Sequence, residues 1–355
     1  MKKLKIFLFL LGLVLGVQLV AFLQILLMPK YMDESRDGAL IGEYYREEKN
    51  HDVIFVGDCE VYENFSPAAL WEEYGISAYI RGSAQQTVWQ SYYLMEETFR
   101  YETPKVMVFN VLSMKYDSPD RTGNPTRREA YNRMTLDGMR WSGSKWKCIQ
   151  ASMTEEERQW QSMWTYLFPI LRYHDRWSKL TGDDFRYLFH RDRIGDSGYL
   201  MQVGVEPVAG EHVEPPLVNP EFGENSWYYL DKMEELCRDH GTELVLIKAP
   251  SLYPVWWEEW DKQIQAYAEE KGLRYYNFLD QQEEIGLDWE KDTYDTGLHL
   301  NVWGAEKLSR YFGKCLREDC GLEDRRQDME LARCWNRRIA DYNQRKQALG
   351  AAPEA

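Results

Sequence analysis

Five short, largely apolar runs alternate with helical patterns along this chain of 355 residues, and this alternation limits its possible folds more than any other feature. The runs occupy residues 53–56, 77–81, 105–110, 243–248 and 274–278. Continuous apolar runs are typical of strands that are buried on both faces. The sequence therefore predicts an α/β domain at residues 51–320, with a five-stranded parallel sheet and helices on both faces.

A long segment separates the third and fourth runs. It has about 130 residues, which is typical of a lid or subdomain rather than a loop. We predict a mostly helical insertion at about residues 113–224, rich in aromatic side chains between residues 140 and 190. These side chains fit either a core of the insertion itself or a platform for a substrate. His174 lies there, and a structural role competes with a substrate contact for it. A charged helix and tail are predicted at residues 321–355.

The N-terminus predicts a membrane anchor. Residues 6–28 carry no charge and would form a helix of about 34 Å, long enough to cross a bilayer. Lys2, Lys3 and Lys5 precede this run, which indicates a cytoplasmic N-terminus and an extracytoplasmic domain. We therefore predict a single-pass signal anchor in the cell membrane at residues 1–30, followed by a stalk at residues 31–50. A cleaved signal peptide is the alternative, although no small-residue cleavage site follows the run.

The charge and the motifs of the chain limit the ligands that it is expected to bind, and its cysteines bear on disulfides. The formal net charge of −15 argues against nucleic acid, because no basic face would neutralise phosphates. No glycine-rich phosphate loop and no metal-ligand spacing is present, so we predict neither a cofactor nor a metal. A domain of this size needs no disulfides, and Cys315 and Cys320 are the only two of the six cysteines close enough in sequence to be considered as a pair.

Two distant segments have the layout of nucleophilic catalysis. The first predicted strand ends in Gly57-Asp58-Cys59, while Asp295 and His299 precede the last predicted helix, about 240 residues later. A histidine held by a carboxylate can activate a thiol, so Cys59 is the predicted nucleophile, His299 the general base and Asp295 its orienting partner. Asp292 is the alternative orienting residue. A thiol at a helix start beside a histidine is also expected to have a lowered pKa.

These two segments resemble the first and last conserved blocks of the SGNH (GDSL-type) hydrolase family, whose fold is flavodoxin-like. The segments at residues 245–250 and 275–278 resemble its membrane-anchored, extracytoplasmic branch, which includes the alginate O-acetylation proteins and the D-alanine-transfer protein of Gram-positive walls. The resemblance covers roughly residues 50–112 and 225–318. The chain departs from the family in having Cys59 in place of serine, and in placing Asp295 four residues before His299 rather than three.

The resemblance implies a site and a function. The backbone N–H of Cys59, with Gly82 and Asn110, would form the oxyanion hole. The activity would be acyl transfer to, or ester hydrolysis on, a cell-envelope polysaccharide, with a membrane-bound O-acyltransferase as a partner. The alternative is a catalytically inactive scaffold that keeps the fold and binds the glycan or the acyltransferase.

Overall fold

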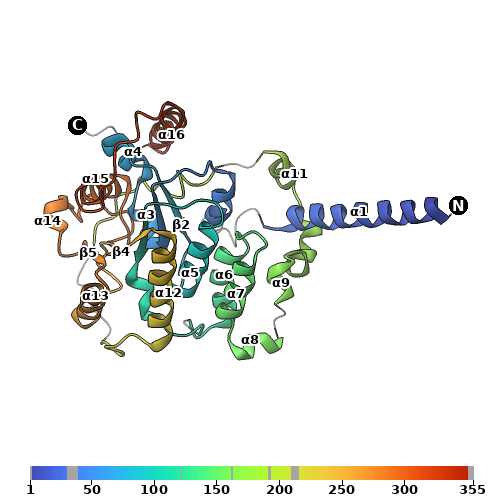
Figure 1. Cartoon of the computed structure of the whole chain (residues 1–355), viewed down its shortest axis with the longest axis horizontal. Coiled ribbons are helices and arrows are strands. Elements are labelled where there is room, and N and C mark those ends of the chain that lie inside the picture. The colour runs from blue at the N-terminus through green and yellow to red at the C-terminus, as the bar shows by residue number, and fades with distance from the viewer. Residues whose placement is uncertain are drawn as a thin grey trace.

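The computed structural model describes residues 2–29, 39–120, 122–160, 163–190, 193–208 and 216–350 (Figure 1). Within these ranges one sheet has five strands, all parallel, in the order β2-β1-β3-β4-β5. The strands are β1 (Val53–Gly57), β2 (Ala78–Gly82), β3 (Val106–Asn110), β4 (Glu243–Lys248) and β5 (Arg274–Asn277). The predicted five-stranded α/β fold is confirmed. In this strand order the connections diverge after β1 and β3, which leaves a crevice for ligands at the carboxyl ends of those two strands.

Helices cover both faces of the sheet (Figure 1). In β1, Ile54 and Val56 belong to the core on one face, and Val53 and Phe55 to the core on the other, as the two-residue period of a strand requires. The first core is covered by α5 (Val88–Thr98), α12 (Glu224–His240) and α13 (Glu258–Lys271). The second core is covered by α3 (Cys59–Asn64), α4 (Pro67–Tyr74) and α15 (Val302–Glu318).

The predicted insertion lies between β3 and β4 and is mostly helical. Its elements are η3 (Val111–Lys115), α6 (Pro125–Leu136), α7 (Gly143–Ser152), α8 (Glu155–Trp160), α9 (Trp164–Leu167), α10 (Ile170–Tyr173), η4 (His174–Lys179) and α11 (Gly182–Phe189). Helix α7 packs on α5, and Cys148 and Ile149 join the first core. The first half of the insertion therefore enlarges the main core, whereas its second half lies beside the N-terminal helix (Figure 1).

The N-terminal helix α1 (Lys2–Leu27) projects away from the domain (Figure 1). Among the described residues it is the one helix that is long and apolar enough to cross a membrane. Its first 21 described residues, 2–22, are exposed, whereas Leu26 and Leu27 are buried. The orientation of α1 in a membrane stays a prediction.

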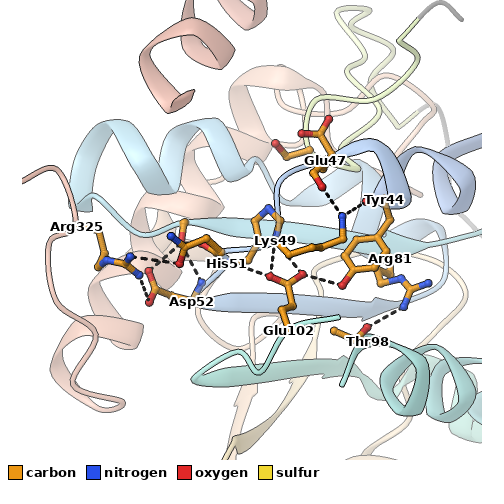
Figure 2. Close-up of polar contacts among 12 residues, drawn as sticks. Tyr44, Glu47, Lys49, His51, Asp52, Arg81, Thr98, Glu102 and Arg325 are labelled. Atoms are coloured by element: carbon orange, nitrogen blue, oxygen red, sulfur yellow. Dashed lines mark hydrogen bonds and ion pairs between the residues drawn. The ribbon is translucent and has the colours of Figure 1, made fainter. Parts of the chain in front are cut away.

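Part of the predicted stalk is integral to the domain. Residues 31–38 lie outside the described residues, but α2 (Leu40–Glu43) and η2 (Tyr44–Arg46) follow them, and Leu40, Ile41 and Tyr44 have no exposed surface. A polar network fixes the next residues to the domain (Figure 2). Glu102 accepts a hydrogen bond of 2.7 Å from the Tyr44 hydroxyl and lies 3.0 Å from Nδ1 of His51. The polar composition of this segment concealed the apolar face that anchors it.

The C-terminal segment returns to the domain through α14 (Gln282–Ile285), α15 and α16 (Met329–Ala348). Helix α16 packs on α4, where Trp335 stacks on Trp71 with ring centroids 5.2 Å apart. The buried Tyr342 donates a hydrogen bond of 2.7 Å to Glu306 on α15. Helix α16 therefore packs on the helical layer that α4 and α15 form over the sheet. Residues 351–355 of the predicted tail lie outside the described residues.

Candidate active site

Cys59 is the first residue of α3 and follows β1 after a sharp turn. Gly57 makes this turn with a φ of +154°, and a Cβ atom there would lie 2.5 Å from the Val61 side chain and 3.1 Å from Asn110. Only glycine fits such a position. The turn places the half-buried Cys59 thiol at the carboxyl end of the sheet, beside the crevice that the strand order creates.

His299 lies in the loop before α15, and Asp295 holds it at two points. The backbone N–H of His299 donates to Oδ1 of Asp295 at 2.8 Å, and Nδ1 of the ring lies 2.7 Å from Oδ2. The loop between them turns through positive φ angles at Thr296 and Gly297. One carboxylate therefore sets both the backbone and the ring orientation of His299.

The structure brings Cys59 and His299 together. The sulfur and the imidazole interact closely enough for each to shift the pKa of the other. Nε2 of His299 is buried and has no hydrogen bond of ordinary geometry within the described residues. Because Asp295 occupies Nδ1, Nε2 is the nitrogen available to take a proton from the thiol. The catalytic roles of Cys59, His299 and Asp295 stay predictions.

The pKa of the Cys59 thiol differs from the sequence-based expectation. Burial raises this pKa to about 11, although the neighbouring His299 opposes the rise. For His299, burial lowers the pKa, but the interaction with Cys59 and the hydrogen bond to Asp295 outweigh burial and raise the pKa well above its usual value. The expected lowering of the thiol pKa is therefore wrong for the resting site, because desolvation of the sulfur outweighs the effect of its neighbour. With a pKa of about 11 the Cys59 thiol is protonated at neutral pH, and the Cys59 charge that raises the His299 pKa is present only when this thiol ionises.

Glu63 is a site residue that the sequence analysis missed. It lies one helical turn after Cys59 on α3, and its Oε2 atom is 3.4 Å from Nδ1 of His299. The Tyr294 hydroxyl donates a short hydrogen bond to this carboxylate, and the Tyr294 ring is nearly parallel to the His299 ring. The i, i+4 spacing from Cys59 was the available signal. Two carboxylates therefore face one edge of His299.

Glu63, Asp295 and His299 also have donor atoms that could hold a metal ion. These atoms lie within 4.8 Å of one another. The 2.7 Å separation between Nδ1 of His299 and Asp295 is that of a charge-assisted hydrogen bond, so a metal would have to displace the proton there. The prediction that the protein binds no metal remains untested.

Asn110 has hydrogen bonds that its predicted oxyanion role would not require. Its amide nitrogen donates to Oδ1 of Asp58 at 3.2 Å and to Oε2 of Glu60 at 2.9 Å. Its oxygen accepts from the backbone of Ala249 at 3.1 Å. Both N–H groups are therefore engaged, and an oxyanion would have to displace one of the carboxylates. The oxyanion role of Asn110 stays a prediction that this arrangement does not favour.

Gly82, the other predicted oxyanion residue, ends β2 opposite Gly57 of β1. A Cβ atom at Gly82 would lie 2.9 Å from the Tyr62 ring, so Tyr62 on α3 packs directly against this backbone. Glycine is required for that close approach. The role of its N–H group, like that of Cys59, stays a prediction.

A fully buried ion pair joins β4 to the residue that follows Cys59 on α3. Nζ of Lys248, at the end of β4, lies 2.9 Å from Oε1 of Glu60 on α3, and Ser251 donates to the same oxygen at 2.6 Å. Burial, with the neighbouring Glu60 charge, raises the pKa of Asp58 to about 6. The signal that the sequence analysis overlooked was a lysine directly after the apolar run at residues 244–247. This cluster ties the start of α3 to β4 and so fixes the position of Cys59.

An apolar cleft of about 800 Å³ borders the site. Its lining includes Lys115, Tyr116, Tyr253, Trp257 and Trp260. The Tyr253 hydroxyl donates a 2.6 Å hydrogen bond to the backbone oxygen of Asp295, and Lys115 interacts electrostatically with Cys59. Two residues that line the cleft therefore interact with residues of the candidate site. Clefts of this size and composition are typical of sites for organic ligands.

Four other residues considered from the sequence lie away from the site or are free thiols. Asp292 forms an ion pair of 2.7 Å with Lys307 and does not contact His299. His174 is exposed, and its Nδ1 atom lies 3.2 Å from the backbone oxygen of Leu171. Cys315 and Cys320 are both free thiols. Asp292 and His174 therefore have structural contacts, and Asp295 is the carboxylate that orients His299.

Comparison with known proteins assigns no family. Neither a protein-family model nor a curated protein sequence matches the chain. Among solved structures, a match was found to a crystal structure from Bacteroides fragilis described as a "putative acylhydrolase". The identity is 11%, the TM-score is 0.39, and the match covers 79% of this chain and 95% of that one. A similarity this low decides nothing about the reaction.

Proposed function

We propose that this protein catalyses acyl transfer or ester hydrolysis through a covalent thioester on Cys59. One observation carries the proposal: a buried imidazole is fixed by Asp295 through one nitrogen and interacts with a thiol from the opposite end of the chain. Such an arrangement is the requirement for an activated nucleophile. The adjoining cleft supplies space for the acyl donor.

The reaction follows from the positions of the three groups. Sγ of Cys59 attacks the carbonyl carbon of an ester while His299 takes the thiol proton. The tetrahedral intermediate collapses, the alcohol leaves with the proton from His299, and the acyl group remains on sulfur. An acceptor hydroxyl or water then attacks the thioester, His299 takes its proton, and Cys59 is released and reprotonated. The N–H of Cys59, in the first turn of α3, is the proposed donor to the oxyanion.

The substrate and location belong to the same proposal. The predicted anchor and the SGNH-like site residues support action outside the cell on an acyl group of a cell-envelope polysaccharide. A membrane-bound O-acyltransferase would supply the acyl group in a transfer pathway. The lysine residues in the first turn of α1 support this orientation, since positive residues favour the cytoplasmic side.

A non-catalytic scaffold is the second candidate, and two observations favour it. Burial raises the pKa of Cys59 to about 11, and both N–H groups of Asn110 are engaged. Hydrolysis of a small acetyl ester by the full chain in lipid nanodiscs distinguishes the two candidates. We expect activity that is lost in Cys59→Ala and in His299→Ala, and Cys59→Ser tests whether a hydroxyl can replace the thiol. Equal activity of wild type and Cys59→Ala would contradict the enzyme proposal.

A further inference from the structure

The second half of the insertion contacts the C-terminal end of α1, which we call its base. Helices α10 and α11 and the 3₁₀ helix η4 contact α1, and Arg176 donates a hydrogen bond of 2.7 Å to the backbone oxygen of Leu27. Figure 1 shows α9 and α11 on either side of the point where α1 leaves the domain. The insertion helices therefore lie at the level at which a membrane-crossing α1 would emerge.

The length of the free part of α1 locates the membrane boundary. The uncharged run begins at Ile6, and the continuously exposed part of the helix ends at Phe22, because Leu23 and Gln24 are partly buried. These 17 residues would span about 26 Å, which is shorter than the ~30 Å hydrocarbon core of a bilayer. The outer boundary of the hydrocarbon must then pass through residues 23–27, where the insertion helices hold α1.

Large apolar side chains are exposed on these same helices. Trp177 on η4 is 72% exposed and Phe189 at the end of α11 is 88% exposed. Trp164, Leu171 and Phe185, on α9, α10 and α11, are each about half exposed. Exposed apolar side chains gathered on neighbouring helices are typical of an interaction surface rather than of a surface that faces water.

The charges of this segment fit a lipid headgroup region. Residues 164–190 carry four basic and three acidic side chains, although the whole chain has a formal net charge of −15. Arg172, Lys179 and Arg186 alternate with the exposed aromatic residues. Tryptophan and basic side chains on short amphipathic helices are the composition of segments that lie in a membrane interface.

We infer that α9, α10, η4 and α11 form a membrane-contact surface, which lies in the headgroup layer of the outer leaflet around the base of α1. The protein then has two attachments to one bilayer, a spanning helix and an interfacial platform. The platform fixes the orientation of the domain relative to the membrane, which a single helix alone could not do. This inference requires α1 to span the bilayer and does not depend on the reactivity of Cys59.

Tryptophan quenching in nanodiscs tests this surface directly, because α1 contains no tryptophan. The full chain is placed in nanodiscs of phosphatidylcholine with brominated acyl chains and, separately, with unbrominated chains. We expect the bromines to quench part of the fluorescence, and Trp177→Phe to lose a share of this quenching while keeping the surface apolar. Trp257→Phe, in the cleft, serves as the matched control and should leave the quenching unchanged.

Gel filtration of the nanodiscs distinguishes insertion of α1 from contact of the surface with lipid, since co-elution of the protein with the discs reports insertion of α1. Co-elution with no bromine-dependent quenching, or with equal quenching in wild type and Trp177→Phe, would overturn the inference and would favour another protein as the occupant of the surface. A second pair of variants checks the apolar contact itself. Phe189→Ser should reduce the quenching of Trp177, whereas Val218→Ser, at a similarly exposed position in the cleft lining, should not.

Discussion

The Glu63 carboxylate lies 3.4 Å from Nδ1 of His299, the same nitrogen that lies 2.7 Å from Asp295. Glu63 reaches this position because it follows Cys59 by one turn of α3, so a single short helix carries the predicted nucleophile and a second acidic neighbour of the base. The two carboxylates have different contacts: Asp295 also binds the backbone of His299, whereas Glu63 accepts from Tyr294.

This difference predicts unequal effects of two substitutions. Asp295→Asn should lower the ester hydrolysis rate by about 100-fold, because His299 loses the partner that fixes its ring. Glu63→Gln removes one negative charge near His299 and should lower the imidazole pKa, which moves the acidic limb of the pH–rate profile about one unit lower. The profiles of both variants and wild type, measured between pH 5 and pH 9, check this. Identical profiles for Glu63→Gln and wild type would show that Glu63 does not affect the pKa of His299.

The buried Glu60–Lys248 pair predicts a rescue of stability. Lys248→Met should lower the free energy of unfolding by about 3–5 kcal/mol, because it leaves the Glu60 carboxylate buried without its partner. The double variant Glu60→Gln/Lys248→Met should recover most of this loss, since neither side chain of the pair is then charged. Urea unfolding followed by circular dichroism measures both values. A double variant no more stable than Lys248→Met would contradict the charge-pair explanation.

Burial of the ionised Asp58 carboxylate should lower the free energy of unfolding by a measurable amount. Its folded-state pKa is raised to about 6, so its contribution to stability is greatest below the unfolded pKa of about 4 and falls as the pH rises through the folded value. Asp58→Asn should therefore increase the free energy of unfolding at pH 7 by about 2 kcal/mol and remove this pH dependence. The exposed Asp239→Asn is the control. Urea unfolding at pH 4 and pH 7 makes the comparison, and lower stability of Asp58→Asn at pH 7 would show that the ionised group is needed for folding.

Thiol labelling tests the interaction between Cys59 and His299. Burial raises the pKa of both Cys59 and Cys315 to about 11, but only Cys59 has a histidine that opposes the rise. Iodoacetamide labelling of Cys59 should therefore be slow at pH 7 and accelerate towards pH 10. His299→Ala should raise the Cys59 pKa further and slow its labelling, while Cys315 labels as before. Labelled peptides quantified by mass spectrometry give both rates, and equal Cys59 rates with and without His299 would mean that the two side chains do not interact.

The fold was predictable because the apolar runs and the turns between them are local features. Each of the five strands was located from its own residues, and the turn after β1 was visible in Gly57 and Asp58. The burial of Leu40 and Tyr44 was not predictable, because the short polar segment that contains them gains its stability from contacts with β2 and Glu102.

The site was predictable in part for the same reason. Cys59 and His299 stand at the end of a strand and the start of a helix, and parallel topology brings such positions to one edge of the sheet. The sequence signals of Glu63 and Lys248 were weaker, because a charged residue in an amphipathic helix or at a strand end usually faces solvent. Only the packing of α3 on the sheet buries them. The raised pKa of Cys59 also depends on this packing, which composition cannot report.

Trapping of the acyl intermediate tests the central claim most directly. The full chain in nanodiscs is mixed with p-nitrophenyl acetate, quenched in acid and digested, and its cysteine-containing peptides are analysed by mass spectrometry. We predict an acetyl thioester on the peptide that contains Cys59, formed faster than on the peptide that contains Cys315 and greatly reduced in His299→Ala. An acetyl group that is absent from Cys59, or that forms there equally fast without His299, would contradict the account.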